Sequence, residues 1–169
     1  MAPLARLGVV FGTAVLLAAG AGARADELST GVALFQQGKF AEAESHLRNA
    51  SGTDASAYLA AALARQKKFG EAEAAAKAAL QDNAAAHEMA VAALGESLVG
   101  QKKHDEAVER MSTAVKARAD LAYAYYWRGQ AYYNKKQPDR MVGDFETFLK
   151  LAPKAPEAAT VQQLLAGLR

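Results

Sequence analysis

Few side chains of this 169-residue chain could carry out catalysis or hold a metal ion. The three histidines, His46, His87 and His104, do not share the i,i+3 or i,i+4 spacing that a metal site on one helix would use. The chain has no cysteine, which excludes disulfides and thiolate metal ligands. It also lacks a nucleophile elbow, a phosphate-binding loop and a dinucleotide fingerprint. We therefore expect a protein that is not an enzyme and that holds no metal and no cofactor.

The stretch YAYYWRGQAYYNKK, residues 123–136, is chemically the most distinctive part of the chain, with six aromatic side chains within eleven positions. Tyrosine and tryptophan are enriched at interaction hot spots, because they bury a large area and still offer a polar tip. The same rings could instead be core residues that are crowded together. Which of them face outward depends on the elements that position them.

The N-terminal residues 1–25 have the pattern of a cleaved signal peptide. Arg6 precedes an apolar run, and ARA at residues 23–25 supplies small residues three positions and one position before a cleavage point at Asp26. An uncleaved membrane anchor is the alternative, although the run is shorter than the roughly 20 residues of a membrane-spanning helix. We expect export to the periplasm, without a lipoprotein anchor because there is no cysteine to acylate.

Removal of this segment would change the charge balance. The full chain has 20 basic and 18 acidic residues, and residues 1–25 contain Arg6 and Arg24 but no Asp or Glu, which leaves 18 of each. A formally neutral chain lacks the basic surface that nucleic acids require. We expect no nucleic-acid binding, and no integral membrane span in the mature chain.

Three segments of the chain align with one another: QQGKFAEAESHL, RQKKFGEAEAAA and GQKKHDEAVERM. Their shared kernel places Ala43, Ala72 and Ala107 at spacings of 29 and 35 residues. Small residues recur upstream of the kernel and continue into a fourth, weaker copy, at Gly31, Ala60, Gly95 and Gly129. This spacing predicts antiparallel helix pairs, in which facing small residues let the two backbones approach closely.

The pattern resembles the tetratricopeptide repeat, a helical hairpin of roughly 34 residues. The third copy matches at Leu94, Gly95, Leu98, Ala107, Met111 and Ala114, and the fourth at Tyr125, Gly129, Tyr132, Phe145 and Pro153. The resemblance covers about residues 26–153, and it implies an all-α, right-handed solenoid of about four hairpins, at about 26–52, 53–87, 88–121 and 122–153. An apolar stripe in residues 154–169 predicts a C-terminal capping helix, formed by Val161, Leu164, Leu165 and Leu168.

Some positions depart from the family pattern. The first copy is about five residues short, and Ala76 stands where a large residue is typical, which predicts a thin core in the second hairpin. Helix propensity and a pair of Glu73 and Lys77 at i,i+4 should compensate locally. Met141 occupies the small-residue position of the fourth copy, so we expect its two helices to be spaced or crossed differently.

In this family the first helix of each hairpin lines a concave face that binds partner proteins. The repeat register assigns these candidate partner-binding residues to that face: Tyr123, Tyr126, Gln130, Tyr133, Asn134, Phe35, Gln36, Arg65, Met89 and Glu96. It assigns Tyr125 and Tyr132 to the core and Trp127 to the margin between the two. The lysine–asparagine–arginine clamp with which some members bind C-terminal carboxylates is absent, so an apolar segment with aromatic or aliphatic anchors is the expected ligand.

The resemblance thus implies a non-enzymatic adaptor or scaffold in the cell envelope, with another protein or peptide segment as its partner. The alternatives are a self-associating structural protein, which would form homo-oligomers, and an accessory module that binds cell-wall glycan through its tyrosines. The C-terminal helix could also fold back and cover the rings. Lysines recur in every turn between paired helices, which is typical of solvation and of a favourable interaction with the helix dipole, and an anionic contact, such as acidic envelope polymer or lipid headgroups, is the alternative.

Overall fold

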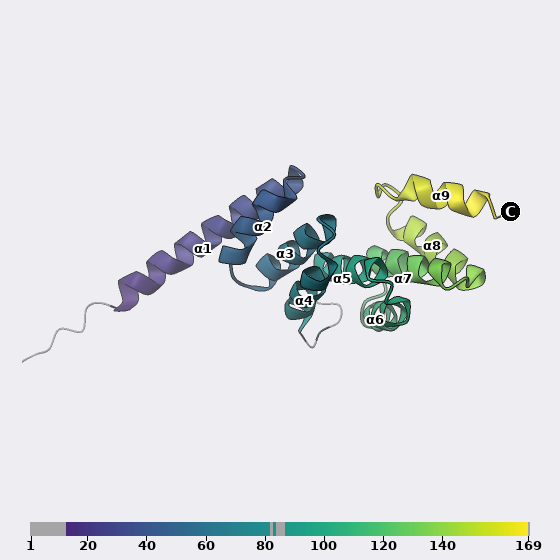
Figure 1. Ribbon diagram of the computed structural model, residues 1–169, viewed down its shortest axis with the longest axis horizontal. Coiled ribbons are helices and arrows are strands. Elements are labelled where there is room, and N and C mark those ends of the chain that lie inside the picture. The colour runs from purple at the N-terminus through teal and green to yellow at the C-terminus, as the bar shows by residue number, and fades with distance from the viewer. Residues whose placement is uncertain (1–12, 82, 84–86, 169) are drawn as a thin grey trace, which may run out of the picture.

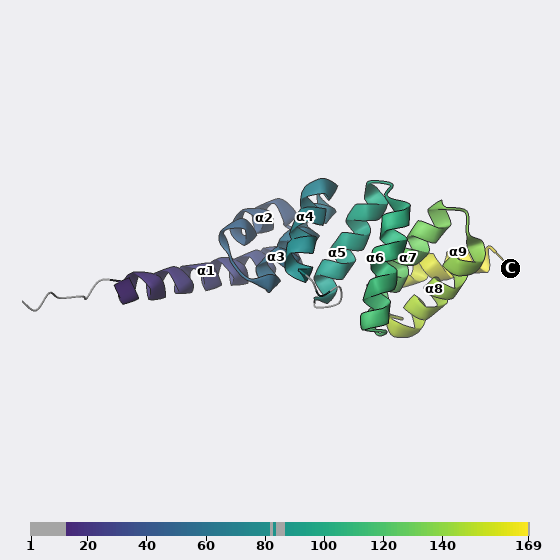
Figure 2. The ribbon, with the colours of Figure 1, turned by 90° about the horizontal axis from the view of Figure 1, so that it is seen from below.

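The computed structural model describes residues 13–81, 83 and 87–168, and for residues 13–23 only the course of the helix. This part of the chain forms helices and no strand: α1 (Thr13–Gln36), α2 (Phe40–Asn49), α3 (Thr53–Arg65), α4 (Phe69–Leu80), α5 (Glu88–Gly100), α6 (His104–Ala117), α7 (Ala122–Asn134), α8 (Pro138–Leu151) and α9 (Ala158–Ala166). The helices follow one another along the long axis of the molecule, and the first turns of α1 project beyond the others (Figures 1 and 2).

The predicted fold class is confirmed. Successive helices pair as α1–α2, α3–α4, α5–α6 and α7–α8, neighbouring pairs pack on each other, and α9 packs on α8. Of the predicted signal peptide, residues 1–12 lie outside the described residues, and the predicted cleavage point between Ala25 and Asp26 falls within α1. None of the helices in the described part of the chain combines the length and the apolar character that crossing a membrane requires.

The turn inside each hairpin has the same backbone conformation. Lys68 N–H donates to the Leu63 carbonyl at 3.0 Å, and Lys67 N–H donates to the Ala64 carbonyl at 2.8 Å. Such bonds close a helix C-terminus when one residue adopts a left-handed conformation. The four equivalent residues do so: Gly38 (φ 77°), Lys67 (φ 62°), Lys102 (φ 61°) and Lys136 (φ 58°). These four residues therefore end the first helix of each pair, and three of them are lysines, which carry a side chain in a conformation that glycine adopts with less strain.

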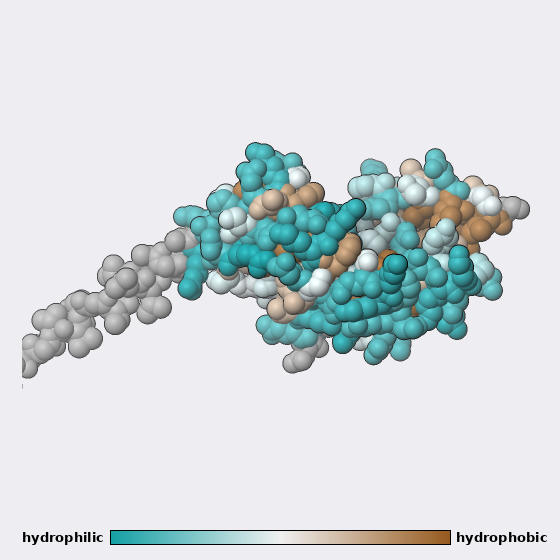
Figure 3. All heavy atoms as spheres, viewed as in Figure 1, coloured by the Kyte–Doolittle hydropathy of each residue, from teal (hydrophilic) through white to brown (hydrophobic). Residues whose placement is uncertain are grey.

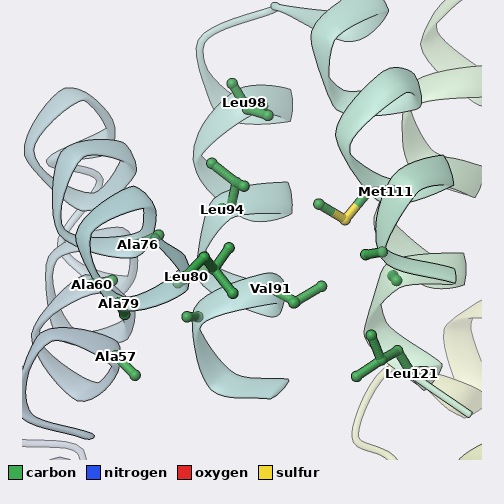
Figure 4. Packing of buried hydrophobic residues seen from close by; sticks show 14 of the residues in the cluster. Ala57, Ala60, Ala76, Ala79, Leu80, Val91, Leu94, Leu98, Met111 and Leu121 are labelled. Atoms are coloured by element: carbon green, nitrogen blue, oxygen red, sulfur yellow. The ribbon is translucent and has the colours of Figure 1, made fainter. Parts of the chain in front are cut away.

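The central core is built largely from alanine on one side and from larger side chains on the other. Figure 4 shows Ala57 and Ala60 of α3 and Ala76 of α4 beside the leucines of α5. Ala76 is fully buried, so the small residue brings the helices close together at that point. Met111 of α6 then fills the far side of α5 (Figure 4). The core of the second hairpin therefore consists mainly of small side chains, as its alanines predict.

The recurring glycines of the repeat make room for large side chains, which adds to the expectation that they face small residues: a Cβ atom at Gly31 would also lie 3.4 Å from the carbonyl oxygen of Ala43, the small residue expected opposite it. A Cβ atom added at Gly31 would lie 2.6 Å from Leu47 Cγ, and one added at Gly129 would lie 2.7 Å from Phe145 Cδ1. At Gly95 the neighbour is Trp127 of the next hairpin, whose Cβ would be 2.5 Å away. Because glycine has no Cβ atom, each of these glycines leaves space that an aromatic ring or a leucine side chain of a neighbouring helix occupies.

The first junction, between hairpins α1–α2 and α3–α4, encloses the carboxylate of Glu44, whose side chain is 12% exposed. Gln66 and Lys68, at the end of α3, each donate a hydrogen bond to it at 2.8 Å, and Arg48 donates from one turn along α2. The hydrogen bond from Lys68 is the largest influence on the pKa of Glu44 and outweighs burial; with Arg48 and Gln66 it lowers that pKa to about 2.

The second junction, between α3–α4 and α5–α6, repeats this arrangement around Glu73. Gln101 and Lys103 donate to the carboxylate at 2.7 and 2.8 Å, and Lys77 donates from one turn along α4. Burial raises the pKa of Glu73, but the hydrogen bonds from Lys103, Lys77 and Gln101 outweigh it and lower that pKa to about 2. Both carboxylates are thus charged at neutral pH, and each accepts hydrogen bonds from three side chains.

The third junction, between α5–α6 and α7–α8, has no such carboxylate among its described residues. Val108 occupies the equivalent position, directly after Ala107, and packs into the core. Gln137 takes the place of Lys103, and its buried Oε1 has no hydrogen-bond partner in the described part of the chain. Arg128 of α7 instead donates to Asp144 of α8 at 2.8 and 2.7 Å and to Ser112 of α6 at 3.1 Å.

Candidate functional site

A cavity of about 400 Å³ opens on the side of the molecule formed by the first helices of the four hairpins. Five residues that the sequence assigned to the partner-binding face line it, namely Phe35, Arg65, Met89, Glu96 and Tyr123. They come from α1, α3, α5 and α7 in turn. The repeat explains this convergence, because equivalent positions of successive first helices project to the same side of a solenoid.

Five further residues complete the lining: Tyr58, His87, Glu88, Ala92 and Trp127. Tyr58 and Trp127 occupy equivalent positions, each two residues before the small residue of its first helix, Ala60 or Gly129. The repeat register predicts Trp127 at the margin of the partner-binding face and does not single out Tyr58. The recurrence of a large aromatic residue at this position in two repeats is the signal that could have identified both.

The walls of the cavity are aromatic and their rings are held in place by neighbours. Phe35 packs edge-on against Tyr58, with ring centroids 5.6 Å apart and planes at 77°. Trp127 rests on Gly95 and packs edge-on against Tyr126 at 4.8 Å. Because these contacts are formed without a ligand, the apolar surface of the cavity is largely preorganised.

Two residues of the cavity lining, Arg65 and Glu96, form an ion pair with each other. Arg65 Nη1 is 3.6 Å from Glu96 Oε1, which is too long for a hydrogen bond. The Glu96 side chain is 18% exposed and that of Arg65 is 43% exposed. Burial raises the pKa of Glu96, and the charge of Arg65 lowers it only in part. The carboxylate is therefore enclosed by the protein without being well paired.

Tyr123 and Tyr126 are partly covered by the C-terminal segment. The Tyr123 hydroxyl donates to Glu157, at the start of α9, at 2.8 Å, and both rings pack against Phe148 of α8. Burial, followed by the hydrogen bond to Glu157, raises the pKa of Tyr123 to about 12. Gln130 donates to the Tyr126 hydroxyl at 3.2 Å. Tyr123 reaches the cavity, whereas Tyr126 and Gln130 support its wall from behind.

The remaining predicted residues lie away from the cavity. Gln36 and Asn134 are exposed at the ends of α1 and α7, and the Asn134 amide donates to the Gln130 carbonyl at 2.8 Å. Tyr133 is 49% exposed and lines a separate hollow of about 330 Å³ beside Met141 and Leu168. Two predicted core rings are placed differently: Tyr132 is buried, while Tyr125 is half-buried under Arg128.

The described residues of the cavity include one histidine, His87, with a carboxylate beside it. His87 Nε2 lies 3.2 Å from an oxygen of the exposed Asp54, and the described lining places no nucleophile beside this pair. No cluster of three or more His, Asp or Glu side chains suited to a metal ion occurs in the described part of the chain. Aromatic walls around a loosely paired carboxylate are instead a surface for recognition.

Stacked helical hairpins with a lined concave side define the class of protein as an all-α helical repeat. The sequence profile of the tetratricopeptide repeat family matches residues 92–159. This match identifies the chain from within α5 to the start of α9 as tetratricopeptide repeats, and the described helices before it share the repeat fold. No curated protein is significantly similar to it in sequence.

Several solved structures share the fold. TTC0263, a thermophilic tetratricopeptide repeat protein of Thermus thermophilus, superposes with a TM-score of 0.73 at 17% identity, over 85% of this chain and 83% of its own. PilF of Pseudomonas aeruginosa has a TM-score of 0.68 at 22% identity, over 88% and 72%. YrrB, a tetratricopeptide repeat protein with an unusual peptide-binding site, has a TM-score of 0.65 at 16% identity, over 88% and 78%. At these identities the likeness shows the fold.

Proposed function

We propose that this protein is a non-enzymatic adaptor that binds a segment of another protein in the cavity between its first helices. The observation that carries the proposal is the convergence of Phe35, Arg65, Met89, Glu96 and Tyr123, from four different helices, on one open cavity. Tetratricopeptide repeat proteins typically act as scaffolds for protein–protein interaction, and their concave surfaces are the usual place of contact.

The dimensions and lining of the cavity support this function. Its volume of about 400 Å³ lies in the range of sites that enclose a small ligand or a few side chains of a peptide. Trp127 and Tyr58 are residue types that contribute strongly to binding, and their fixed rings reduce the entropy lost on association. YrrB offers a parallel within the fold, since it has a peptide-binding site.

We propose the periplasm as the place of action, on the basis of the signal-peptide pattern in residues 1–25. N-terminal sequencing of the protein from the cells that produce it should give Asp26 as the first residue. A protein that retains residues 1–25 and fractionates with membranes would contradict export in soluble form.

Photo-cross-linking in those cells tests the adaptor function directly. p-Benzoyl-phenylalanine in place of Glu88, which is exposed and lines the cavity, should trap a discrete foreign protein. The same probe in place of Ala74, which is exposed on α4, is the control and should not trap it. The absence of a foreign product at Glu88, with the variant folded, would overturn the proposal.

Self-association is a second candidate, favoured by exposed apolar side chains at the C-terminal end. Tyr133, Leu151 and Leu168 are 49%, 41% and 54% exposed. Figure 3 shows apolar surface gathered over α8 and α9. A cross-linked product of twice the chain mass, together with a dimer in light scattering, would support self-association over the adaptor. Glycan binding has less support, because the Tyr123 and Tyr126 hydroxyls are already engaged within the chain.

A further inference from the structure

We propose that the cavity receives a basic side chain, lysine or arginine, of the segment that it binds. This inference rests on the proposed function and adds the chemistry of the partner to it. It modifies the expectation from the sequence, which was an apolar segment with aromatic or aliphatic anchors. Three features of the cavity support it: the carboxylate inside, the charges around that carboxylate and the rings that enclose it.

Glu96 is an enclosed carboxylate to which no donor of the described residues makes a hydrogen bond, and His87 Nδ1 of the same lining is also buried without a partner in the described part of the chain. The side chain of Glu96 is 82% enclosed, its ion-pair partner in the described chain is Arg65 alone, and that separation of 3.6 Å exceeds hydrogen-bonding distance. By contrast, Glu44 and Glu73, which are enclosed to a similar degree, each accept hydrogen bonds from several donors. A carboxylate in the position of Glu96 gains most from a ligand that brings N–H donors and a positive charge.

The surroundings of Glu96 add negative charge to the same side of the cavity. Glu88 lies in the lining, where Arg118 Nη2 approaches it at 3.6 Å, and the charge of Glu157 acts on Glu96 and on Tyr126 from the C-terminal segment. Burial is the main cause that raises the pKa of Tyr126, and the charges of Glu157 and Glu96 raise it further. A cation is therefore the complementary charge for this cavity.

Arg65 is the one lysine or arginine among the described residues of the lining, and its position does not satisfy the site. It is 43% exposed, and it approaches Glu96 at 3.6 Å without a hydrogen bond. A ligand cation can bind the other carboxylate oxygen of Glu96, or displace the guanidinium of Arg65, which is partly exposed and can turn into solvent.

The aromatic walls suit a cation as well. A lysine or arginine group over the face of a tryptophan or tyrosine ring is attracted by the ring quadrupole. The protein uses this contact twice elsewhere, with Arg128 5.4 Å from the Tyr125 centroid and Arg140 5.6 Å from the Tyr132 centroid. In the described part of the chain, no such contact is formed by the cavity rings of Tyr58 and Trp127. The methylene groups of a basic side chain would pack against the same rings.

Selection from a random seven-residue peptide library displayed on phage tests the proposal without knowledge of the natural partner. The full-length mature protein is compared with Glu96→Gln, which keeps the shape of the side chain and removes its charge. Glu109→Gln, an exposed carboxylate on α6, is the matched control, and Ala92→Trp fills the cavity. Thermal melts establish that all four proteins are folded. A selected peptide is then synthesised with its basic residue or with norleucine, and binding is followed by the fluorescence of the only tryptophan, Trp127.

We expect lysine or arginine to be enriched with the wild type and with Glu109→Gln, and not with Glu96→Gln. Replacement by norleucine should weaken binding to the wild type about tenfold, in line with the loss of one charged hydrogen bond. It should change binding to Glu96→Gln much less. Enrichment of apolar or acidic peptides that depend on an open cavity would overturn the basic side chain and leave the adaptor function standing. Equal selection by the wild type and Ala92→Trp would overturn both.

Discussion

At the first two junctions between hairpins, a buried glutamate collects donors from the next turn, whereas at the third junction Val108 and Trp127 fill the space with apolar surface. The repeat thus joins its units in two different ways. Glu44 and Glu73 fix the position of the next hairpin by directional hydrogen bonds, which tolerate little displacement. At the third junction Trp127 fits against Gly95, which brings the indole to the wall of the cavity. This apolar contact lies beside polar contacts of Arg128 with Ser112 and of Lys135 with Asp105, while Val108 stands in place of the buried glutamate.

Loss of both junction carboxylates should have the largest effect and should depend on pH. Their pKa values are about 2 in the folded protein and 4.5 in an unconstrained chain. Because the folded-state pKa is lowered, their contribution is present in full above pH 4.5, declines below it, and is lost as the pH falls through about 2. The double variant Glu44→Gln/Glu73→Gln should lose about 4 kcal/mol of unfolding free energy at pH 7 and almost none at pH 2.

The unfolding free energies of the wild type and the double variant are measured by urea unfolding between pH 7 and pH 2. Glu42→Gln/Glu109→Gln, which changes two exposed carboxylates, is the control. A difference between wild type and double variant that is the same at pH 7 and pH 2 would mean that the hydrogen bonds do not carry the two junctions.

A methyl group at Gly95 should break the third junction. The new Cβ atom would lie 2.5 Å from Trp127 Cβ, so the helices must separate or the indole must move. We expect Gly95→Ala to cost about 3 kcal/mol, as overpacking of a core does. Gly143→Ala, on the open face of α8 where no atom of the described residues would lie within 4 Å of it, should instead gain about 0.5–1 kcal/mol through helix propensity. Equal effects at the two glycines, in chemical denaturation, would contradict the role of the indole.

The third junction should form the glutamate–lysine hydrogen bond of the other two junctions when both residues are introduced. Val108→Glu alone places a carboxylate beside Gln137, whose Oε1 already lacks a partner among the described residues, and should destabilise the protein. The second substitution, Gln137→Lys, supplies the ammonium donor that Lys68 and Lys103 provide at the first two junctions. A double-mutant cycle should give a favourable coupling of about 1.5 kcal/mol. A coupling near zero would show that the backbone of the third junction cannot bring these positions together.

The smallest effect is expected at the turns that present the donors. Lys102 has φ 61°, between Gln101 and Lys103, which both bind Glu73. Lys102→Gly should stabilise the protein by about 0.5–1 kcal/mol, because glycine adopts this conformation without strain. Gly38→Ala, at the equivalent residue of the first turn, should lower the melting temperature in turn. A loss of stability in Lys102→Gly would indicate that its side chain has an energetic role of its own.

Much of the fold was predictable from the sequence, because a repeat presents its register several times. The kernel around Ala43, Ala72 and Ala107 predicted the hairpins, and the first-helix register placed Phe35 and Arg65 on the side where the cavity lies. The i,i+4 spacing also predicted the pair of Glu73 and Lys77.

What the sequence did not predict depends on contacts between hairpins. Trp127 reaches the cavity because Gly95, more than thirty residues earlier, has no side chain and leaves space for the indole. Tyr126 packs against Phe148 of α8 and lies behind the cavity wall. Tyr123 is held by a hydrogen bond to Glu157, at the start of α9. Periodicity fixes the direction of a side chain on its own helix, and it carries no information on which neighbour arrives to cover it.

The placement of Trp127 has a consequence for the way such a protein can change its partner. One indole both closes a cavity wall and holds the fourth hairpin to the third, so any substitution that reshapes the pocket at this point also loosens the stack. Ala92 and Met89 line the same cavity without that second task. Variation among descendants of this sequence should therefore accumulate at Ala92 and Met89, while Trp127 and Gly95 are inherited together or lost together.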